Sequence, residues 1–287
     1  MLYILLSVCC SVIVSVMLKL AKRYHVDMLQ AITWNYSVAI ALTWLIFRPH
    51  WVSLQSAPFD NYAALGILLP SLFVILARSV RHTGIVRTDI AQRLSLFIPI
   101  VAAYWIFGDQ PSMLKITGII IGFVAIFCSI PWGKSGGGSK SGIGAWLYLL
   151  IIFVGMGIID ILFKNLAAYK AIPYTTSLFI VFVLAFVVSF ILLAIKIARG
   201  YTKFSFPHIL IGWSLGIANF GNILFYIKAH QALAKQPSTV FSAMNMGVIV
   251  LGTLIGLFVF KEKLSTLNKV GVFLALVSII VITYSSY

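Results

Sequence analysis

Residues 78–93 read Arg78-Ser79-Val80-Arg81-His82-Thr83-Gly84-Ile85-Val86-Arg87-Thr88-Asp89-Ile90-Ala91-Gln92-Arg93. This stretch places four arginines and one aspartate between an apolar run that ends near Ala77 and a second apolar run at 94–107. Charge inside apolar sequence is costly in a bilayer, so such positions are functional candidates by default. The stretch therefore indicates a membrane-embedded fold with a charged site inside it.

The composition is that of a helical membrane protein. Of 287 residues, 61% are hydrophobic and 9% are charged, whereas a soluble domain carries about 25% charged residues. The apolar runs 116–130 and 178–195 lack the alternation of outer-membrane barrel strands. A net charge of +15 would suggest nucleic acid as a partner of a soluble protein. Here the basic residues lie mostly at the ends of apolar runs, where they meet anionic lipid, so no nucleic acid partner is expected.

We expect an all-α integral membrane protein with ten transmembrane helices, each close to the roughly 20 residues that cross about 30 Å of hydrocarbon. The expected spans are 2–18, 28–47, 61–80, 85–107, 112–130, 143–163, 173–195, 207–227, 237–260 and 266–284. The first is interpreted as a span and not as a signal peptide, because no charged residue precedes it. Pro99 is expected to kink the fourth span just beyond Arg93.

A Gly/Ser-rich segment, 133–142, has the composition of a flexible linker and divides the chain into two groups of five spans, 1–132 and 143–287. It contains Gly133-Lys134-Ser135, but a phosphate-binding loop needs a glycine at position 128, which is Cys128. No Cys/His pair has zinc-type spacing. Neither a metal nor another cofactor is therefore expected.

The two groups repeat one another in sequence. The segment 107–118 matches 260–271 at an offset of 153, and the matched pairs include Asp109 with Glu262, Ser112 with Ser265 and Gly118 with Gly271. Because five spans is an odd number, the second copy must enter the membrane in the opposite direction. Two inverted five-helix repeats with a site near the bilayer midplane are typical of secondary transporters.

An acid at the end of one span, a serine shortly after it and a glycine in the next span, repeated in both halves of a ten-span chain, resemble the drug/metabolite transporter superfamily, EamA-like branch. The resemblance covers essentially the whole chain. It implies a central pathway lined by spans 1, 3, 4, 6, 8 and 9, and it implies export as the commoner role. The segments around Lys19 and Lys164 also resemble the first helix of small multidrug resistance proteins. The proton-binding glutamate of those proteins is replaced here by Ser11 and Met156, which argues against proton coupling at that position.

Asp89, Gln92 and Arg93 form the first candidate substrate site, because their spacing puts them on one helix face. Arg93 lies eight residues past Ile85, about 12 Å into the span, which is too deep for a span-end residue. An arginine offers a forked donor set to a carboxylate or phosphate, and an aspartate binds an ammonium group or fixes the arginine. The alternative is a self-neutralised pair that only holds the helix in the bundle.

Spans 8 and 9 carry further polar side chains at helical spacing: Asn219, Asn222 and Tyr226 in the former, Ser242 and Asn245 in the latter. Such stripes line a pathway or form interhelical hydrogen bonds worth about 0.6 kcal/mol each. Because the repeat matches these spans to spans 3 and 4, we expect them to line the pathway. The charged positions of span 4 correspond to neutral residues in span 9, so the charges belong to one half only.

Other polar residues are assigned to a vestibule or to structural roles. The expected gate or vestibule residues are Arg78, Arg81, Arg87, His82 and His230, of which the arginines snorkel to the membrane surface. His82 and His230 occupy matching repeat positions at an offset of 148. Asp160 and Lys164, four residues apart, are expected to form a neutralised pair on a helix surface.

The distribution of basic residues bears on orientation. Of the 21 Lys and Arg residues, six fall on the face that carries both termini and fifteen on the other. The positive-inside rule then puts both termini outside the cytoplasm, whereas the family resemblance implies that they are inside it. We expect a multi-pass protein of the cell (inner) membrane, monomeric or homodimeric, with both termini on one side.

These features favour a secondary transporter that moves a small polar metabolite by alternating access, and the resemblance implies that it is an exporter. The expected solute is an amino acid or another zwitterionic or anionic molecule, and a coupled proton or counter-substrate is compatible with the sequence. A lipid-carrier flippase and a nucleotide-sugar or organophosphate exchanger of the same fold remain alternatives. A membrane-embedded enzyme would need a clustered nucleophile, base or metal set in the spans, and none is found, so no catalytic residue is expected.

Overall fold

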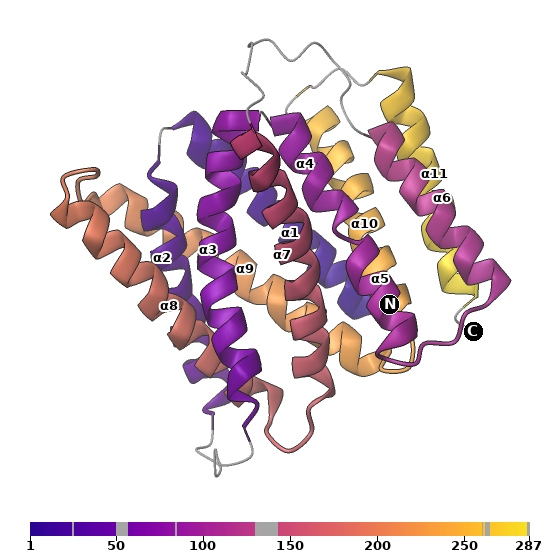
Figure 1. Cartoon of the computed structure of the whole chain (residues 1–287), viewed down its shortest axis with the longest axis horizontal. Helices are drawn as coiled ribbons and strands as arrows, with labels where there is room; N and C mark the ends of the chain where they lie inside the picture. The colour runs from indigo at the N-terminus through magenta and orange to yellow at the C-terminus, as the bar shows by residue number, and fades with distance from the viewer. Residues whose placement is uncertain are drawn as a thin grey trace.

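The computed structural model describes residues 1–24, 26–49, 57–83, 85–129, 143–259, 261 and 265–285, and every regular element in these ranges is a helix (Figure 1). The helices are α1 (Leu2–Arg23), α2 (Met28–Phe47), α3 (Phe59–Thr83), α4 (Ile85–Leu94), α5 (Phe97–Trp105), α6 (Met113–Ser129), α7 (Ile143–Ala168), α8 (Tyr174–Ala198), α9 (Phe206–Ala232), α10 (Pro237–Phe258) and α11 (Thr266–Tyr284). The expected linker 133–142 lies outside the described residues.

Seven of the described helices, α2, α3 and α7 to α11, are long and apolar enough to cross a bilayer. Shorter apolar stretches, Leu2–Leu18 in α1 and Met113–Cys128 in α6, accompany them. Because the lipid-facing side chains of such helices are not covered by protein, large apolar residues such as Trp105, Ile217 and Phe273 are exposed. The chain thus has the all-helical architecture of a multi-pass membrane protein.

The expected fourth span, 85–107, contains two helices, because α4 ends at Leu94 and α5 begins at Phe97. Pro99 explains the break, since it has no N–H to donate to the carbonyl of residue 95 and its ring would clash with that carbonyl. The Ser95 carbonyl instead accepts the N–H of Ile98 at 3.0 Å. The Ser95 hydroxyl donates to the carbonyl of Gln92 at 2.6 Å. The regular helix is therefore interrupted directly beyond Arg93.

Helices from the two halves of the chain are interleaved in the bundle (Figure 1). α1 packs on α9, and α7 packs on α3; α2 packs on α9, and α8 packs on α3. α1 also contacts α10, while α7 contacts α4 and α5. Two further pairs, α2 with α8 and α6 with α11, join equivalent helices, and α6 and α11 form one edge of the bundle (Figure 1). The correspondence between the halves is α1 with α7, α2 with α8, α3 with α9, α4–α5 with α10, and α6 with α11. When each helix is replaced by its counterpart, the same set of these pairings results.

Two glycines let α9 approach α2 closely. A Cβ added to Gly212 would lie 2.7 Å from the carbonyl oxygen of Ala31, and a Cβ added to Gly216 would lie 2.6 Å from that of Asn35. Both contacts are with backbone, which cannot rotate away as a side chain can. Small residues four apart serve the same purpose in many membrane helix pairs.

The repeated motif of the sequence has a repeated structure. Gly108 and Lys261, which are equivalent at the offset of 153, both have a left-handed backbone, with φ of 64° and 52°. The Ser112 hydroxyl accepts the N–H of Lys115 at 3.1 Å before α6. Its equivalent, Ser265, accepts the N–H of Asn268 at 3.2 Å before α11. In both halves, therefore, a left-handed residue lies four positions before a serine that caps the next helix.

Candidate functional site

A cavity of about 330 Å³ lies among α1, α3, α7, α9, α10 and the α4–α5 break. This volume is at the low end of the range for small-molecule sites, roughly 300–1,000 Å³. Three of the lining segments come from each half of the chain. They are the segments that the family resemblance implied would line a central pathway.

Helical periodicity explains which side chains reach the cavity. α3 contributes Leu69, Leu72, Phe73 and Leu76, and α7 contributes Met156, Ile159, Asp160 and Phe163. Both sets follow the i, i+3, i+4, i+7 spacing of one helix face. Apart from the single carboxylate, these two helices present an apolar wall.

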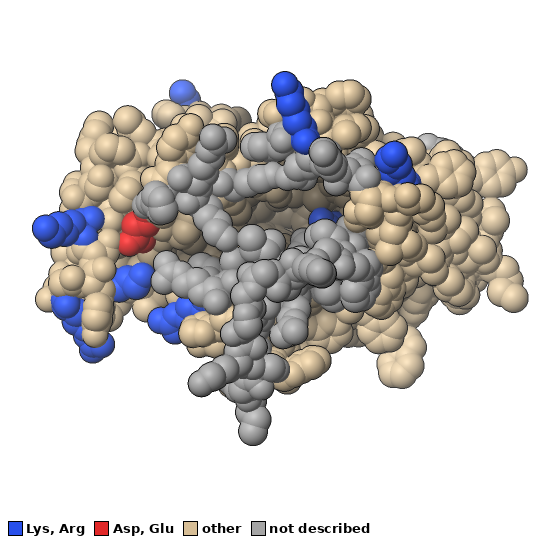
Figure 2. Space-filling model, turned by 90° about the horizontal axis from the view of Figure 1, so that it is seen from above, with Lys and Arg blue, Asp and Glu red and all other residues tan. Residues whose placement is uncertain are grey.

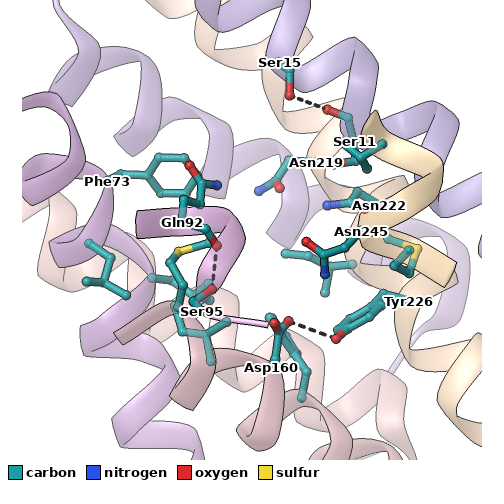
Figure 3. Close-up of a pocket in the computed structure, with 18 of the residues that line it drawn as sticks. Ser11, Ser15, Phe73, Gln92, Ser95, Asp160, Asn219, Asn222, Tyr226 and Asn245 are labelled. Atoms are coloured by element: carbon teal, nitrogen blue, oxygen red, sulfur yellow. Dashed lines mark hydrogen bonds between the residues drawn. The ribbon is translucent and has the colours of Figure 1, made fainter. Parts of the chain in front are cut away.

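The other lining helices, α1, α9 and α10, contribute most of the polar residues, together with Ile223, Met244 and Val248. Their polar residues are Ser11, Ser15, Asn219, Asn222, Tyr226 and Asn245. Figure 3 shows Asn219, Asn222 and Asn245 around one space with Gln92, and Asp160 with Tyr226 at its lower edge. The Asn222 side-chain oxygen accepts from the Ser7 hydroxyl at 2.8 Å, and the Asn245 amide donates to the Phe241 carbonyl at 3.1 Å. These bonds fix the orientation of two of the amides.

The α4–α5 break brings Gln92, Arg93 and Ser95 to the cavity. Arg93 lies in the last turn of α4, where the carbonyl ends of the helix favour a cation. Gln92 and Arg93, which were expected to bind substrate, thus line the same cavity as Asn219, Asn222 and Tyr226 of α9. The side chain of Asp89, the third member of the expected cluster, is not among those that the structure describes, and neither are those of Arg81 and Arg87.

The expected surface pair between Asp160 and Lys164 is wrong. The Lys164 amine is buried, donates to the carbonyl of Ala234 at 2.9 Å and lies 5.7 Å from the centre of the Phe107 ring. The Asp160 carboxylate instead lines the cavity and accepts the hydroxyl of Tyr226 at 2.9 Å (Figure 3). The sequence placed both residues on one helix face, but their spacing could not show that the amine turns to another part of the chain.

Two other assignments, those of His230 and Ser242, need correction. His230 is not at a vestibule: it is fully buried, between the rings of Tyr226 and Phe241, whose centroids each lie 4.7 Å away. Ser242 is also buried and does not line the cavity, although Asn245, one turn later, does. His82 is exposed and stacks on Tyr148 at 5.5 Å, so the two matched histidines have different surroundings.

Arg78 is exposed near the end of α3, as expected of a residue at the rim. Figure 2 views the bundle from the top edge of Figure 1 and shows a hollow near the centre of this face, with Lys and Arg side chains around it. Both termini lie in the lower half of Figure 1.

A buried ion pair joins α6 to α10. The Lys115 amine donates to Asp109 Oδ1 at 2.9 Å, and Asp109 Oδ2 accepts the backbone N–H of Ser238 at 3.0 Å. Both charged side chains are at most 4% exposed. Asp109 therefore fixes the start of α10 against the start of α6.

Comparisons with known proteins define the relatives of the chain. No family model matches it. A solved protein structure superposes with a TM-score of 0.73 and 14% sequence identity, over 99% of this chain and 97% of that one, which shows that the fold is shared. A Haemophilus influenzae protein, described as uncharacterized, is 42% identical over 288 aligned positions, which cover 98% of this chain and 97% of the relative. At this identity and coverage, the chain belongs to the same protein family as its Haemophilus influenzae relative.

Proposed function

We propose that the chain is a secondary transporter for a small polar metabolite, an amino acid or another zwitterionic or anionic solute, and a member of the drug/metabolite transporter superfamily. In this proposal α4 and α5 together make one span, so that ten spans form two inverted five-helix repeats. The equivalent helix pairings support the repeats, as do the left-handed residue and the N-cap found before both α6 and α11.

The observation that carries the proposal is the cavity at the broken helix. Irregular backbone at membrane depth is tolerated where it is buried in protein or lines an aqueous cavity, and transporter sites are typically formed by discontinuous helices. Here the break places Gln92, Arg93 and Ser95 in a cavity that also receives three asparagines. A cavity that both halves line is the arrangement in which rocking of one half against the other exposes a solute alternately to the two faces.

The chemistry of the lining supports a small polar solute. Arg93 supplies a fork of donors suited to a carboxylate, and the amide side chains can donate and accept. The apolar wall of α3 and α7 supplies contact area for the body of the solute.

Uptake into proteoliposomes, measured with a panel of amino acids, organic anions and organophosphates, tests the proposal. We expect saturable transport of at least one solute, and we expect Arg93→Ala to reduce it at least tenfold. Arg199→Ala, at the exposed end of α8, is the matched control and should keep most of the activity. Two results together would contradict the proposal: no panel solute is transported, and cells that carry Arg93→Ala keep the same activity as cells that carry the wild-type protein.

A further inference from the structure

We propose that Asp160, positioned by Tyr226, is the ammonium-binding group of the cavity, so that the solute carries a protonated amine on a compact apolar body. This inference rests on the proposed transport function and narrows it, because it excludes solutes that carry only negative charge.

Asp160 belongs to the cavity and not to a helix surface. It lies on the face of α7 that also presents Met156, Ile159 and Phe163 to the cavity. These neighbours are apolar, so the carboxylate is the single polar group that α7 brings to the cavity. A charged group held among apolar side chains is costly unless it has a partner or a ligand.

The hydrogen bonds of Asp160 leave it able to accept more donors. Its Oδ1 accepts the Tyr226 hydroxyl at 2.9 Å, whereas an ionised carboxylate has about four acceptor positions. The Lys164 amine, one turn along α7, is committed to the Ala234 carbonyl. The partner that the structure gives the Asp160 carboxylate is the Tyr226 hydroxyl, and none of the described cations forms an ion pair with it. An ammonium group, which has three donors and no acceptor, complements it.

The rest of the cavity fits the other parts of such a solute. Asn219 and Asn245 add amide groups to the same cavity, and the leucines that α3 contributes to its lining supply contact area for an apolar body. Arg93 lines the same cavity from α4 and suits the carboxylate of a zwitterion. A solute with only negative charge would gain from Arg93 but would be repelled by Asp160.

Tyr226 acts on the ammonium group through Asp160 and is therefore a positioning residue. Its hydroxyl fixes one carboxylate oxygen, and its ring is held edge-on by Phe163 at 6.1 Å between centroids. Removing the hydroxyl should leave the charge of Asp160 in place but allow the carboxylate to rotate. The expected effect is smaller than that of neutralising Asp160.

Three probes of similar shape test the inference: leucine, 3-methylbutylamine, which lacks the carboxylate, and 4-methylpentanoate, which lacks the amine. Their binding to the purified full-length protein in lipid nanodiscs is measured by calorimetry. The variants are Asp160→Asn, which keeps the shape of the side chain, Tyr226→Phe, and Asp60→Asn as a control that removes an exposed carboxylate from the start of α3.

The inference predicts a selective loss. Asp160→Asn should weaken the binding of leucine and of 3-methylbutylamine by about tenfold to a hundredfold, the range expected when a charge-assisted hydrogen bond is lost. The binding of 4-methylpentanoate should be unchanged or tighter. Tyr226→Phe should weaken the binding of the same two probes by a smaller factor. Asp60→Asn should change the affinity for none of the three probes.

Three results would overturn the inference. The first is equal weakening of all three probes by Asp160→Asn, which would indicate a structural role. The second is wild-type protein that binds 4-methylpentanoate but neither amine-bearing probe. The third is wild-type protein that binds none of the probes. Transport of any other panel solute in the second or third case would leave the proposed function standing, whereas absence of all transport would remove both.

Discussion

The Lys115 amine and the Asp109 carboxylate, 2.9 Å apart, form an ion pair that is almost completely shielded from solvent. Such a pair stabilises the fold less through its own attraction than through the cost of leaving either partner alone. Lys115→Met should therefore lower the free energy of unfolding by about 3–5 kcal/mol, measured by denaturation in detergent. The double variant Lys115→Met/Asp109→Asn should recover part of the loss. Lys170→Met, at an exposed lysine, is the control. Additive losses in the double variant would contradict this account.

The close approach of α9 to α2 predicts opposite effects for two glycine substitutions. Gly216→Ala would force a Cβ against the Asn35 carbonyl and should cost about 1–3 kcal/mol of unfolding free energy, as overpacking does. Gly252→Ala, in α10, meets no atom within 4 Å and should be neutral or stabilise by up to about 1 kcal/mol through helix propensity. Thermal unfolding of both variants checks the contrast, and a more stable Gly216→Ala would show that the helices can move apart freely.

The left-handed backbone at Lys261 predicts a stabilising substitution. A side chain in this conformation costs roughly 1–2 kcal/mol, which glycine avoids, although glycine also has more freedom in the unfolded chain. Lys261→Gly should therefore raise the unfolding free energy by up to about 1 kcal/mol. The reverse change at the equivalent position, Gly108→Ala, should lower it by a similar amount, because an added Cβ there has no contact within 4 Å and only the backbone term acts. A destabilised Lys261→Gly would show that this lysine side chain has a binding partner.

Asp27, which precedes α2 and lies outside the spans, should make the free energy of unfolding depend on pH in the acid range. Its carboxylate caps α2 by accepting the N–H of Leu29 at 2.8 Å, and it accepts the Thr202 hydroxyl at 2.6 Å. Burial is the largest single influence and raises the pKa of Asp27, but the hydrogen bonds from Thr202 and two backbone N–H groups and the charge of Lys196 together hold that pKa below its usual value.

Because the pKa is lowered in the folded state, the ionised Asp27 stabilises the fold above the unfolded pKa of about 3.9, and this contribution is lost as pH falls through the folded pKa. The difference in stability between wild type and Asp27→Asn should be constant above about pH 5 and shrink on acidification. Asp27→Ala should lower the free energy of unfolding by about 1 kcal/mol at every pH, because it also removes the N-cap of α2. A wild-type advantage that grows at low pH would contradict the sign of the pKa shift.

Apolar periodicity predicted most of the helices, because each span must by itself supply enough hydrocarbon-compatible side chains to cross a bilayer. The fourth span shows the limit of this reasoning. Pro99 signalled a kink, but whether a proline bends a helix or divides it depends on what satisfies the freed carbonyl. Here Ser95 and Ile98 provide a short turn that allows two separate helices.

Part of the candidate site was also predictable. Asn219, Asn222, Tyr226 and Asn245 reach the cavity because their helical spacing already placed them on common faces. Asp160 was missed because an i, i+4 rule cannot distinguish an ion pair with Lys164 from a lysine that turns to a carbonyl 70 residues away. The position of Ser11 was a usable signal, since it corresponds, by resemblance alone, to the glutamate of small multidrug resistance proteins, and it lines the cavity.

The equivalent of Lys115 in the second half is Asn268, a neutral residue that caps α11 at an exposed start. The start of α6 is therefore held by a buried pair of charges, whereas the residue that matches its lysine, at the start of α11, is neutral. If the two halves rock against each other, opening the bundle at the start of α6 and opening it at the start of α11 have different free-energy costs. The empty protein then has a preferred resting orientation, and the binding free energy of the solute must supply the difference before the opposite orientation is reached.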